Sequence, residues 1–306
     1  MAINTLAFAT ELTKQLDQAT VQMCKTGFME NNLQGISFVG TKNVKIPHME
    51  TQGLGNYDRD NGFVTGSVTT TEDIYTLTQD RGRQFQLDRQ DVDETNYIAT
   101  IANLAKVFQE EHVIPEIDAY RMSKIAQAGK PDLVVQTTST VATTGIKDAI
   151  RSDIVKIRRQ GFNGKLVMMC SWDVKEALEA AISAQLRTTT LTAGSVNEDV
   201  YAYNDVTMVP MPDNCLYTKL KLNDGKTSGQ KEGGYTADST SANIDYLIFP
   251  MSLPLGVSKQ DNARIFTPEQ NQKLDAWQYD YRKYHDLFIK SHQKSLIVGR
   301  TWKSSS

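Results

Sequence analysis

The 306-residue sequence predicts an α+β fold with two domains, one of them discontinuous along the chain. Three observations predict it. Residues 44–80 form two extended runs around a glycine-rich stretch, and apolar residues then recur at helical spacing as far as residue 129. From residue 137 to residue 250, patterns of buried strand and amphipathic helix follow one another, and an aromatic-polar alternation comes after them.

The N-terminal segment predicts an arm that covers residues 1–43. Apolar side chains at three- and four-residue spacing, among them Phe8, Leu12, Leu16 and Met23, indicate an amphipathic helix over residues 5–26. Glycines 27 and 35 break this pattern. The chain is then expected to run extended over residues 36–46, with a turn at Gly40.

Residues 44–80 predict an extended loop, a long β-hairpin without a hydrophobic core of its own. Residues 44–46 and 73–77 read as its strands, and Asn61 with Gly62 is the best candidate for its tip. Legs of about 17 residues at roughly 3.3 Å each would reach about 50 Å. A lone hairpin is marginal in water. We therefore expect a neighbouring subunit to cover its apolar side chains, which are Leu54, Tyr57, Phe63, Val64 and Val68.

A long helix is predicted after a half-buried strand over residues 79–88. The acidic residues Asp91, Asp93 and Glu94 suit its N-terminus. The apolar stripe runs from Ile98 to residue 125 and resumes on both sides of Pro115, which predicts a kink there. At about 1.5 Å per residue, some 35 residues span roughly 50 Å. This helix is a spine rather than a compact core element.

The following module, residues 136–256, is expected to be an α/β domain. Thr144 can cap a helix over residues 146–157 that ends at Gly161, and Ser171 can cap a second helix after a strand over residues 165–170. Further strands are predicted over residues 200–203, 206–211, 216–222 and 244–250. The polar stretch 223–243 predicts a mobile surface loop.

The C-terminal segment predicts strands that return the chain to the long helix. Residues 277–289 alternate aromatic with polar side chains, residues 295–298 follow as a second antiparallel strand, and both could pack beneath the helix. The peripheral domain would then comprise residues 81–135 and 257–306. Residues 136–256 would be inserted in it as the axial domain.

Composition limits the possible functions. The net charge is −3, so no global basic field indicates nucleic-acid wrapping. Cys24, Cys170 and Cys215 lie far apart without a CxxC pair, which argues against a disulfide framework or a zinc site. The sequence has no Walker motif, GxGxxG or metal-ligand spacing of histidines, so no cofactor or metal is expected. No leader and no apolar run of about 18 residues indicate export or membrane insertion.

One catalytic reading stays open as an alternative of another class. Cys170 lies at a predicted strand end before a helix, and His285 could serve as its base, as in a soluble α/β hydrolase with a thiol nucleophile. A small buried hydrophobe is the commoner role of cysteine at such a position. We therefore expect no enzyme activity.

Several motifs give the chain a resemblance to a known family. They are TQGLG at 51–55, YDR at 57–59, TQDRGR at 78–83, DVDET at 91–95, PEIDAYR at 115–121 and the aromatic run at 276–286. Together with the order of arm, hairpin, spine, α/β module and closing strands, they resemble the major capsid proteins of tailed double-stranded-DNA bacteriophages with the HK-ninety-seven-like fold, such as those from phages or prophages of Gram-positive bacteria. The resemblance covers nearly the whole chain.

The resemblance implies a structural head protein, located in the virion capsid and assembled in the bacterial cytoplasm. Hexamers and pentamers would close into an icosahedral shell around double-stranded DNA, contacted without sequence specificity, and the extended loop would overlap a neighbouring subunit. A portal protein would be a further partner. The same fold also occurs in encapsulin-like nanocompartments that hold cargo proteins, which is the second candidate function.

Two departures from the wider family change the expected partners. Some relatives carry a fused scaffolding segment before the arm; because the arm begins near Met1 here, a separate scaffolding protein is expected. Some relatives cross-link the loop through a lysine, but no lysine lies between Lys45 and Lys106. Shell strength would then be noncovalent or come from a decoration protein.

Candidate contact residues lie on the hairpin and the strand that follows it. The apolar and charged candidates are Leu54, Tyr57, Asp58, Arg59, Asp60, Phe63, Arg81 and Arg83. The neighbouring charges Asp80, Asp88 and Arg89 could form further intersubunit ion pairs. Such pairs would fix the relative position of two subunits more than they would strengthen the contact between them.

Overall fold

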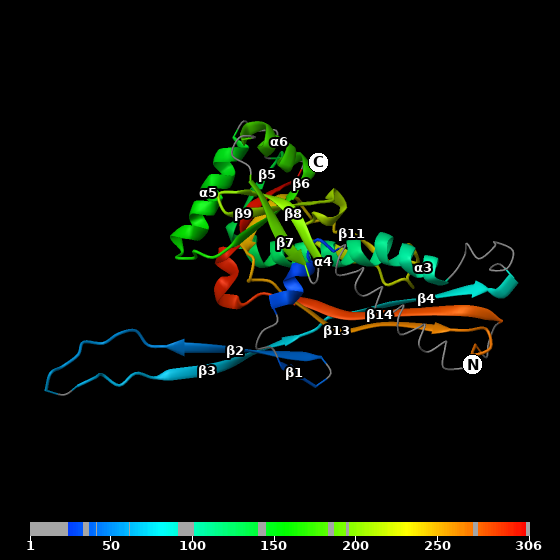
Figure 1. Cartoon of the computed structure of the whole chain (residues 1–306), viewed down its shortest axis with the longest axis horizontal. Helices are drawn as coiled ribbons and strands as arrows, with labels where there is room; N and C mark the ends of the chain where they lie inside the picture. Colours follow the sequence, from blue (N-terminus) through cyan, green and yellow to red (C-terminus); the bar gives the residue numbers. More distant parts are fainter. Residues whose placement is uncertain are drawn as a thin grey trace.

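The computed structural model describes residues 24–32, 37–40, 42–60, 62–90, 101–139, 145–182, 187–193, 196–271 and 275–303. A long hairpin projects at one end of the molecule, and a three-stranded sheet with a long helix extends toward the other end (Figure 1). A seven-stranded sheet with two further helices stands above the point where they meet (Figure 1).

The paired strands of the hairpin are longer than the sequence predicts. After a 3-10 turn, η1 (Gly27–Asn32), strand β1 (Ser37–Val39) turns at Gly40, whose φ is +68°, into β2 (Asn43–Thr51). Strand β3 (Val68–Thr76) pairs with β2 in antiparallel register along its whole length. The helix predicted over residues 5–26 lies outside the described residues except for its last three, which do not form a helix.

The three-stranded sheet has the order β13-β14-β4 and is antiparallel. Its strands are β4 (Gln79–Asp88), β13 (Leu255–Phe266) and β14 (Ala276–Phe288). Strands β4 and β14 confirm the predictions, and Tyr279 and Tyr281 pack beneath the long helix as expected. Strand β13 is not predicted from the sequence. It is an edge strand whose middle, SKQDNAR, is mostly polar, so it lacks a clear apolar alternation.

The long helix is continuous in the described residues, but its irregularity differs from the predicted kink. It consists of α3 (Ile101–Phe108), a π-helical segment η2 (Gln109–Val113) and α4 (Ile114–Gly129). The π turn immediately precedes Pro115 and accommodates the proline, which has no N–H to donate back into the preceding turn. Residues 91–100, with the predicted acidic helix start, lie outside the described residues.

Gly129 ends α4 as predicted, although its φ is −85° and no left-handed turn is involved. A glycine is required because a Cβ at this position would overlap the side chain of Ile297. We expect Gly129→Ala to lower the free energy of unfolding by about 1–3 kcal/mol through overpacking. Urea denaturation measures this, and in an Ile297→Ala background the further loss caused by Gly129→Ala should be smaller. Gly53→Ala, at an exposed position with no neighbouring atom within 4 Å, is the control and should have little effect.

The seven-stranded sheet is mixed and has the order β5-β15-β12-β6-β9-β8-β7. Its strands are β5 (Leu133–Gln136), β6 (Leu166–Ser171), β7 (Arg187–Ala193), β8 (Val196–Tyr203), β9 (Val206–Met211), β12 (Asn243–Pro250) and β15 (Val298–Trp302). Helices α5 (Ile146–Arg159) and α6 (Trp172–Ile182) pack on one face, and α4 packs on the other (Figure 1). The core of the molecule therefore lies on both faces of this sheet.

Several local predictions for this region need correction. Residues 291–296 form a 3-10 turn, η7 (Ser291–Leu296), and the last strand is β15, which joins the seven-stranded sheet rather than the three-stranded one. The N-cap of α5 is Gly145, and Thr144 lies outside the described residues. Ser171 does cap α6, since its hydroxyl accepts a hydrogen bond from the Val174 N–H at 3.3 Å.

The polar stretch after residue 216 contains a short strand that the sequence does not predict. The strand expected over residues 216–222 is reduced to β10 (Leu220–Leu222), which follows a short 3-10 turn, η6 (Asp213–Cys215). Within the predicted loop, β11 (Tyr235–Ala237) pairs with β10. A further 3-10 turn, η3 (Lys130–Asp132), connects α4 to β5.

Candidate subunit-contact site, the hairpin and its anchors

The hairpin tip, residues 52–67, extends beyond the ladder of β2 and β3 and closes in a tight turn. The backbone N–H of Asp58 donates to the carbonyl of Gly62 at 3.1 Å, and the Gly62 N–H donates back at 2.8 Å. Gly62 has φ +80°, as a turn glycine requires. The predicted turn position is confirmed for Gly62, whereas Asn61 lies outside the described residues.

Apolar side chains of the hairpin tip are exposed to solvent. Leu54 is fully exposed, Phe63 is 88% exposed, and the Tyr57 ring contacts Phe63 with the ring centroids 4.9 Å apart. Val64 and Val68 are also exposed. A contiguous exposed apolar patch marks an interaction surface. The predicted contact residues Leu54, Tyr57, Asp58, Arg59, Asp60 and Phe63 are thus gathered on one projecting element, and their contact role stays a prediction.

Arg81 and Arg83 instead reach toward their own chain. Arg81 donates to the Glu116 carboxylate at 3.0 Å and to the carbonyl of Asn223 at 2.9 Å. Arg83 donates to the carbonyl of Lys231 at 3.2 Å. Both arginines therefore hold the 223–234 segment against β4. Arg81 is already paired with a carboxylate, so it is a weaker intersubunit candidate than Arg83.

The other predicted ion-pair residues behave in the same way. Asp80 accepts two hydrogen bonds from the exposed Arg282 guanidinium, at 2.8 and 2.6 Å. The nearest carboxylate oxygens to Arg89 are at 3.8 and 4.0 Å, on Asp275 and Glu269, and the Asp88 carboxylate accepts the N–H of Gln90. These charges are engaged within their own subunit.

The root of the hairpin is fixed by a small hydrophobic cluster. Val44, Ile46 and Leu77 are buried against Val257, Tyr284 and Phe288 of the three-stranded sheet. The Tyr284 hydroxyl also donates to the carbonyl of Leu77 at 3.1 Å. The absence of a hydrophobic core, which the sequence predicts for the whole hairpin, is therefore confined to its projecting part.

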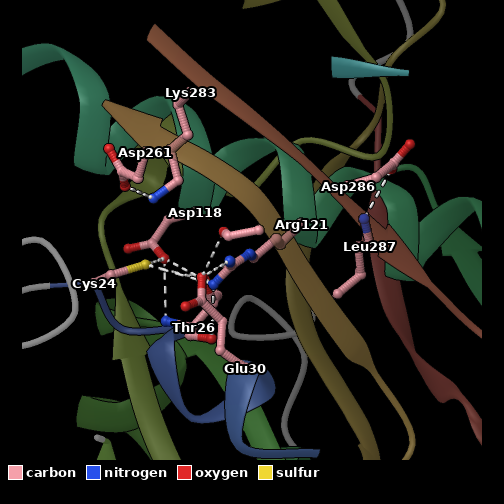
Figure 2. A network of polar contacts seen from close by, with 10 residues as sticks. Cys24, Thr26, Glu30, Asp118, Arg121, Asp261, Lys283, Asp286 and Leu287 are labelled. Atoms are coloured by element: carbon pink, nitrogen blue, oxygen red, sulfur yellow. Dashed lines mark hydrogen bonds and ion pairs between the residues drawn. The ribbon is translucent and has the colours of Figure 1, made fainter. Parts of the chain in front are cut away.

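Asp286 joins the hairpin root to the long helix. Its buried carboxylate accepts hydrogen bonds from the N–H and the hydroxyl of Thr78, both at 2.8 Å, and from the Tyr120 hydroxyl at 2.7 Å. The N–H of Leu287 donates to the same carboxylate (Figure 2). Thr78 lies between β3 and β4, so one carboxylate sets the point from which the hairpin leaves the body.

A second anchor holds the N-terminal arm on the same turn of α4 that carries Tyr120. Asp118 accepts hydrogen bonds from the N–H of Thr26 at 3.0 Å, from its hydroxyl at 2.6 Å and from the Cys24 thiol at 2.9 Å. Arg121, which is fully buried, donates to the Thr26 carbonyl at 3.1 Å and pairs with Glu30 (Figure 2). The arm and the hairpin are thus both positioned by residues 118–121.

Beside these anchors lies His285, which is buried on β14. Burial lowers its pKa well below 6.5, and the charges of Arg121, Lys283 and Arg81 lower it further. The imidazole is therefore neutral in the native protein at neutral pH. Its ring meets that of Tyr120 edge to face, with the centroids 5.7 Å apart.

The buried His285 predicts a loss of stability in mild acid. The unfolded chain binds a proton near pH 6.5 and the native protein does not, so the free energy of unfolding should fall as the pH drops below about 6.5, by at most about 1.4 kcal/mol per pH unit. Urea denaturation between about pH 7.5 and 5.5 measures this slope. His285→Phe should flatten the slope in this range, and an unchanged slope in that variant would contradict the assignment.

The thiol alternative finds no support in the geometry. Cys170 lies on β6 with no exposed surface, and burial raises its pKa to about 12, so the thiol is protonated at neutral pH. Its sulfur hydrogen-bonds to the Val209 carbonyl at 4.0 Å and to no histidine of the described chain. His285 belongs to the other sheet. The predicted Cys–His pair is therefore not assembled.

The described ranges contain neither a candidate metal site nor a candidate membrane-spanning helix. No group of three or more His, Cys, Asp or Glu side chains there could hold a metal ion. No helix in these ranges is both long and apolar enough to cross a membrane.

Comparison with solved structures places this geometry in a known fold. The capsid of cyanophage P-SCSP1u matches 88% of this chain and 86% of its own at 12% identity, with a TM-score of 0.55. The mature capsid of bacteriophage PhiM1 matches 87% and 83% at 12% identity, with a TM-score of 0.54. The chain has the HK-ninety-seven-like capsid fold. A structure from Mycobacterium phage Ogopogo, at 7% identity over 90% of this chain and 91% of its own, has a TM-score of 0.51.

The match to known proteins comes from the solved structures. No protein-family model and no curated protein matches the chain. In terms of this fold, β2 and β3 are the extended loop, α3 to α4 are the spine helix beside the peripheral sheet, and the seven-stranded sheet is the axial domain. The predicted fold class is confirmed. The domain boundaries and the Gram-positive origin stay predictions.

The motif PEIDAYR, residues 115–121, supplies the α4 side chains that hold β4, the N-terminal arm and the hairpin root. Glu116 holds Arg81, Asp118 and Arg121 hold the arm, and Tyr120 holds Asp286. The sequence points to this segment only as part of a resemblance. The sequence does carry one physical signal for this segment, which is the density of charged residues on a helix that is otherwise apolar. Because buried charges persist only when they are paired, such a density predicts polar contacts with other segments.

Proposed function

We propose that this chain is the major capsid protein, or major head protein, of a tailed double-stranded-DNA bacteriophage. It self-assembles through hexamers and pentamers into an icosahedral shell that encloses the genome. The observation that carries the proposal is a hairpin fixed at its root whose projecting apolar side chains are not covered by any other described part of the chain. The fold, shared with solved phage capsids, points in the same direction.

Assembly follows from the energetics of the exposed side chains. Burial of one large apolar side chain contributes about 1.5–3 kcal/mol, so a neighbouring copy that covers Leu54, Tyr57 and Phe63 would supply a substantial part of one contact. A projecting arm lets each copy touch several others, and many modest contacts then act together. Contacts between different surfaces of identical copies close into rings when the rotation permits it.

The proposed partners follow from this role. Packaged DNA is contacted without sequence specificity, a separate scaffolding protein guides assembly, and a portal protein occupies one vertex. The proposed locations are the virion capsid and, during assembly, the bacterial cytoplasm. No lysine lies between Lys45 and Lys106, so the projecting part of the hairpin cannot donate an amine to an isopeptide bond, and shell strength would be noncovalent or come from a decoration protein.

Electron microscopy of the purified protein, with and without a coexpressed scaffold, tests the proposal. We expect rings or closed icosahedral particles in negative stain. A nuclease-protection assay on particles from infected or producing cells separates a genome-containing head, which protects DNA, from a compartment that holds cargo proteins. A protein that stays monomeric at high concentration in physiological salt would overturn the proposal.

A further inference from the structure

A cleft of about 580 Å³ opens between the edge strand β4, the π turn of the long helix and the 223–234 segment. Its lining runs from Phe85 to His285, next to the hairpin root. Its floor is aromatic, because the Phe108 ring lies edge-on to the rings of Phe85 and Tyr281, with the centroids 4.9 and 5.8 Å apart. Clefts of several hundred Å³ that combine an apolar floor with a few polar groups are typical small-molecule sites. The cleft is therefore large enough for a small organic molecule.

Arg83 lies at the rim of this cleft and has no ion-pair partner in the described chain. One of its nitrogens, Nη1, donates to the backbone carbonyl of Lys231 at 3.2 Å. Gly225 and Gly233 approach the same nitrogen closely, since a Cβ on either would lie 3.2 or 3.5 Å from it. A guanidinium carries five N–H donors in a fork that fits both oxygens of a carboxylate. The backbone therefore holds Arg83 in place and leaves donors for an anionic group.

The lining of the cleft carries no net charge. It contains four lysine or arginine side chains and four aspartate or glutamate side chains, which are Asp80, Arg81, Arg83, Glu116, Asp224, Lys226, Glu232 and Lys283. Several of them are paired: Arg81 with Glu116, Lys283 with Asp261 at 2.6 Å, and Asp80 with Arg282. The attraction for an anion is therefore local to Arg83 and does not come from a general positive field.

One polar atom in the wall is also left without a partner. The Nδ1 atom of His285, a residue that is 4% exposed and lines the cleft, has no hydrogen-bond partner among the described residues. A buried polar atom without a partner is unfavourable in the folded protein. A polar group of an occupant, or a water molecule held between the occupant and the imidazole, would satisfy it.

We propose that this cleft binds a small aromatic monocarboxylate, with its ring on the floor formed by Phe85, Phe108 and Tyr281 and its carboxylate on the Arg83 guanidinium. Arg83 is the pairing partner of Tyr281 between β4 and β14 and lies two residues from Phe85, so all three share one face of the sheet. The positions for the ring and for the charge are therefore adjacent. A small-molecule site of this kind goes beyond the proposed function and does not depend on assembly.

The charges of the rim select a ligand with a single negative charge. Asp224 and Glu232 belong to the same rim as Arg83, so they would repel a polyanion such as a nucleic acid or a polyphosphate. A neutral aromatic molecule would leave the donors of Arg83 unused. A bound monocarboxylate would connect β4, the long helix and the 223–234 segment, and we therefore expect it to raise the melting temperature of the subunit in proportion to its occupancy.

Binding of naphthoate to the full-length subunit tests the site. We expect saturable binding in isothermal titration calorimetry, and binding at least about tenfold weaker for naphthalenemethanol, which has the same ring without the charge. Arg83→Gln should weaken the binding of naphthoate by about tenfold or more. Arg264→Gln, which changes an exposed arginine on the opposite edge strand β13, is the matched control and should bind naphthoate normally. Leu54→Ser with Phe63→Ser should also bind it normally, which separates the cleft from the apolar hairpin tip.

Thiol labelling supplies a second readout that leaves Arg83 unchanged. Lys226→Cys places a thiol on the cleft rim, and naphthoate at about ten times its Kd should slow the reaction of this thiol with a maleimide by about tenfold. Arg151→Cys, an exposed position on α5, is the control and should react at an unchanged rate, and the native cysteines are buried.

The outcomes separate this site from the proposed function, because every measurement uses the unassembled subunit. Equal binding of naphthoate and the neutral alcohol, or undiminished binding in Arg83→Gln, would overturn the site. So would the absence of saturable binding, or labelling of Lys226→Cys that naphthoate does not slow. None of these results bears on whether the chain forms a shell, and a chain that forms no shell would leave the site standing.

Discussion

Removal of the hairpin tip should abolish closed particles while the fold of the subunit survives. In this variant, residues 52–67 are replaced by a two-residue Asn-Gly turn that joins β2 to β3. The root cluster, the Asp286 hydrogen bonds and both large sheets remain intact. If Leu54 and Phe63 are no longer buried against a neighbouring subunit, each contact between subunits is weakened by at least about 3 kcal/mol. This corresponds to more than about a hundredfold in the association constant of that contact. Negative-stain microscopy and circular dichroism measure the two effects.

A matched variant tests whether assembly depends on the apolar side chains of the tip or only on the length of the hairpin. Leu54→Ser with Phe63→Ser keeps the hairpin and its turn, and should also reduce particle yield, because only exposed side chains are changed. Thermal unfolding of both variants should stay close to that of the unmodified subunit. If the shortened protein closes into particles of normal yield and resistance to denaturant, the hairpin is not the element that joins the copies.

The sequence predicts the large elements of the fold well because their patterns are local. The hairpin turn at Gly62, the strand β4 and the cap at Ser171 all depend on residues that are neighbours in the chain. The edge strand β13 is missed for the opposite reason. Its order comes from pairing with β14, and its polar middle carries little preference of its own.

Long-range polar contacts were the harder part of the candidate site. Arg81 and Arg83 look like free surface charges in the sequence, yet they hold a segment about 150 residues further along the chain. The same contacts hold residues 223–234, the loop between the paired strands β10 and β11, against β4. The apolar contact candidates of the tip, in contrast, lie on the surface as expected, since no other described part of the chain covers them.

The two anchors fix the points from which the hairpin and the N-terminal arm leave the body of the subunit. Asp286 and Tyr120 fix where the hairpin starts, and Asp118 and Arg121 fix where the arm starts, on one turn of α4. A projecting element that is held rigidly at its root presents its apolar tip in one direction, and less conformational entropy is then lost when it docks. The stability of this turn therefore bears on assembly as well as on folding.

Arg121→Met should be among the most destabilising single substitutions in the subunit. Burial raises the pKa of Glu30, but the charge of Arg121, that of Lys283 and the hydrogen bond from Arg121 outweigh it and hold the pKa below its usual range. Methionine fills a similar space and leaves the Glu30 carboxylate without its arginine partner beside the buried Asp118. Loss of one partner of a buried ion pair costs about 3–5 kcal/mol, measurable by urea denaturation at neutral pH.

Arg282→Met provides the control for this prediction, because it makes the same change in an exposed ion pair. Arg282 donates two hydrogen bonds to Asp80, but its side chain is 57% exposed, and such pairs contribute about 1 kcal/mol or less. Glu30→Gln added to Arg121→Met should recover part of the loss, since it removes the uncompensated carboxylate. Hydrogen exchange of residues 24–32 should rise in Arg121→Met and not in Arg282→Met. Equal losses in the two arginine variants would show that burial of the Arg121 network does not determine how firmly the arm is held.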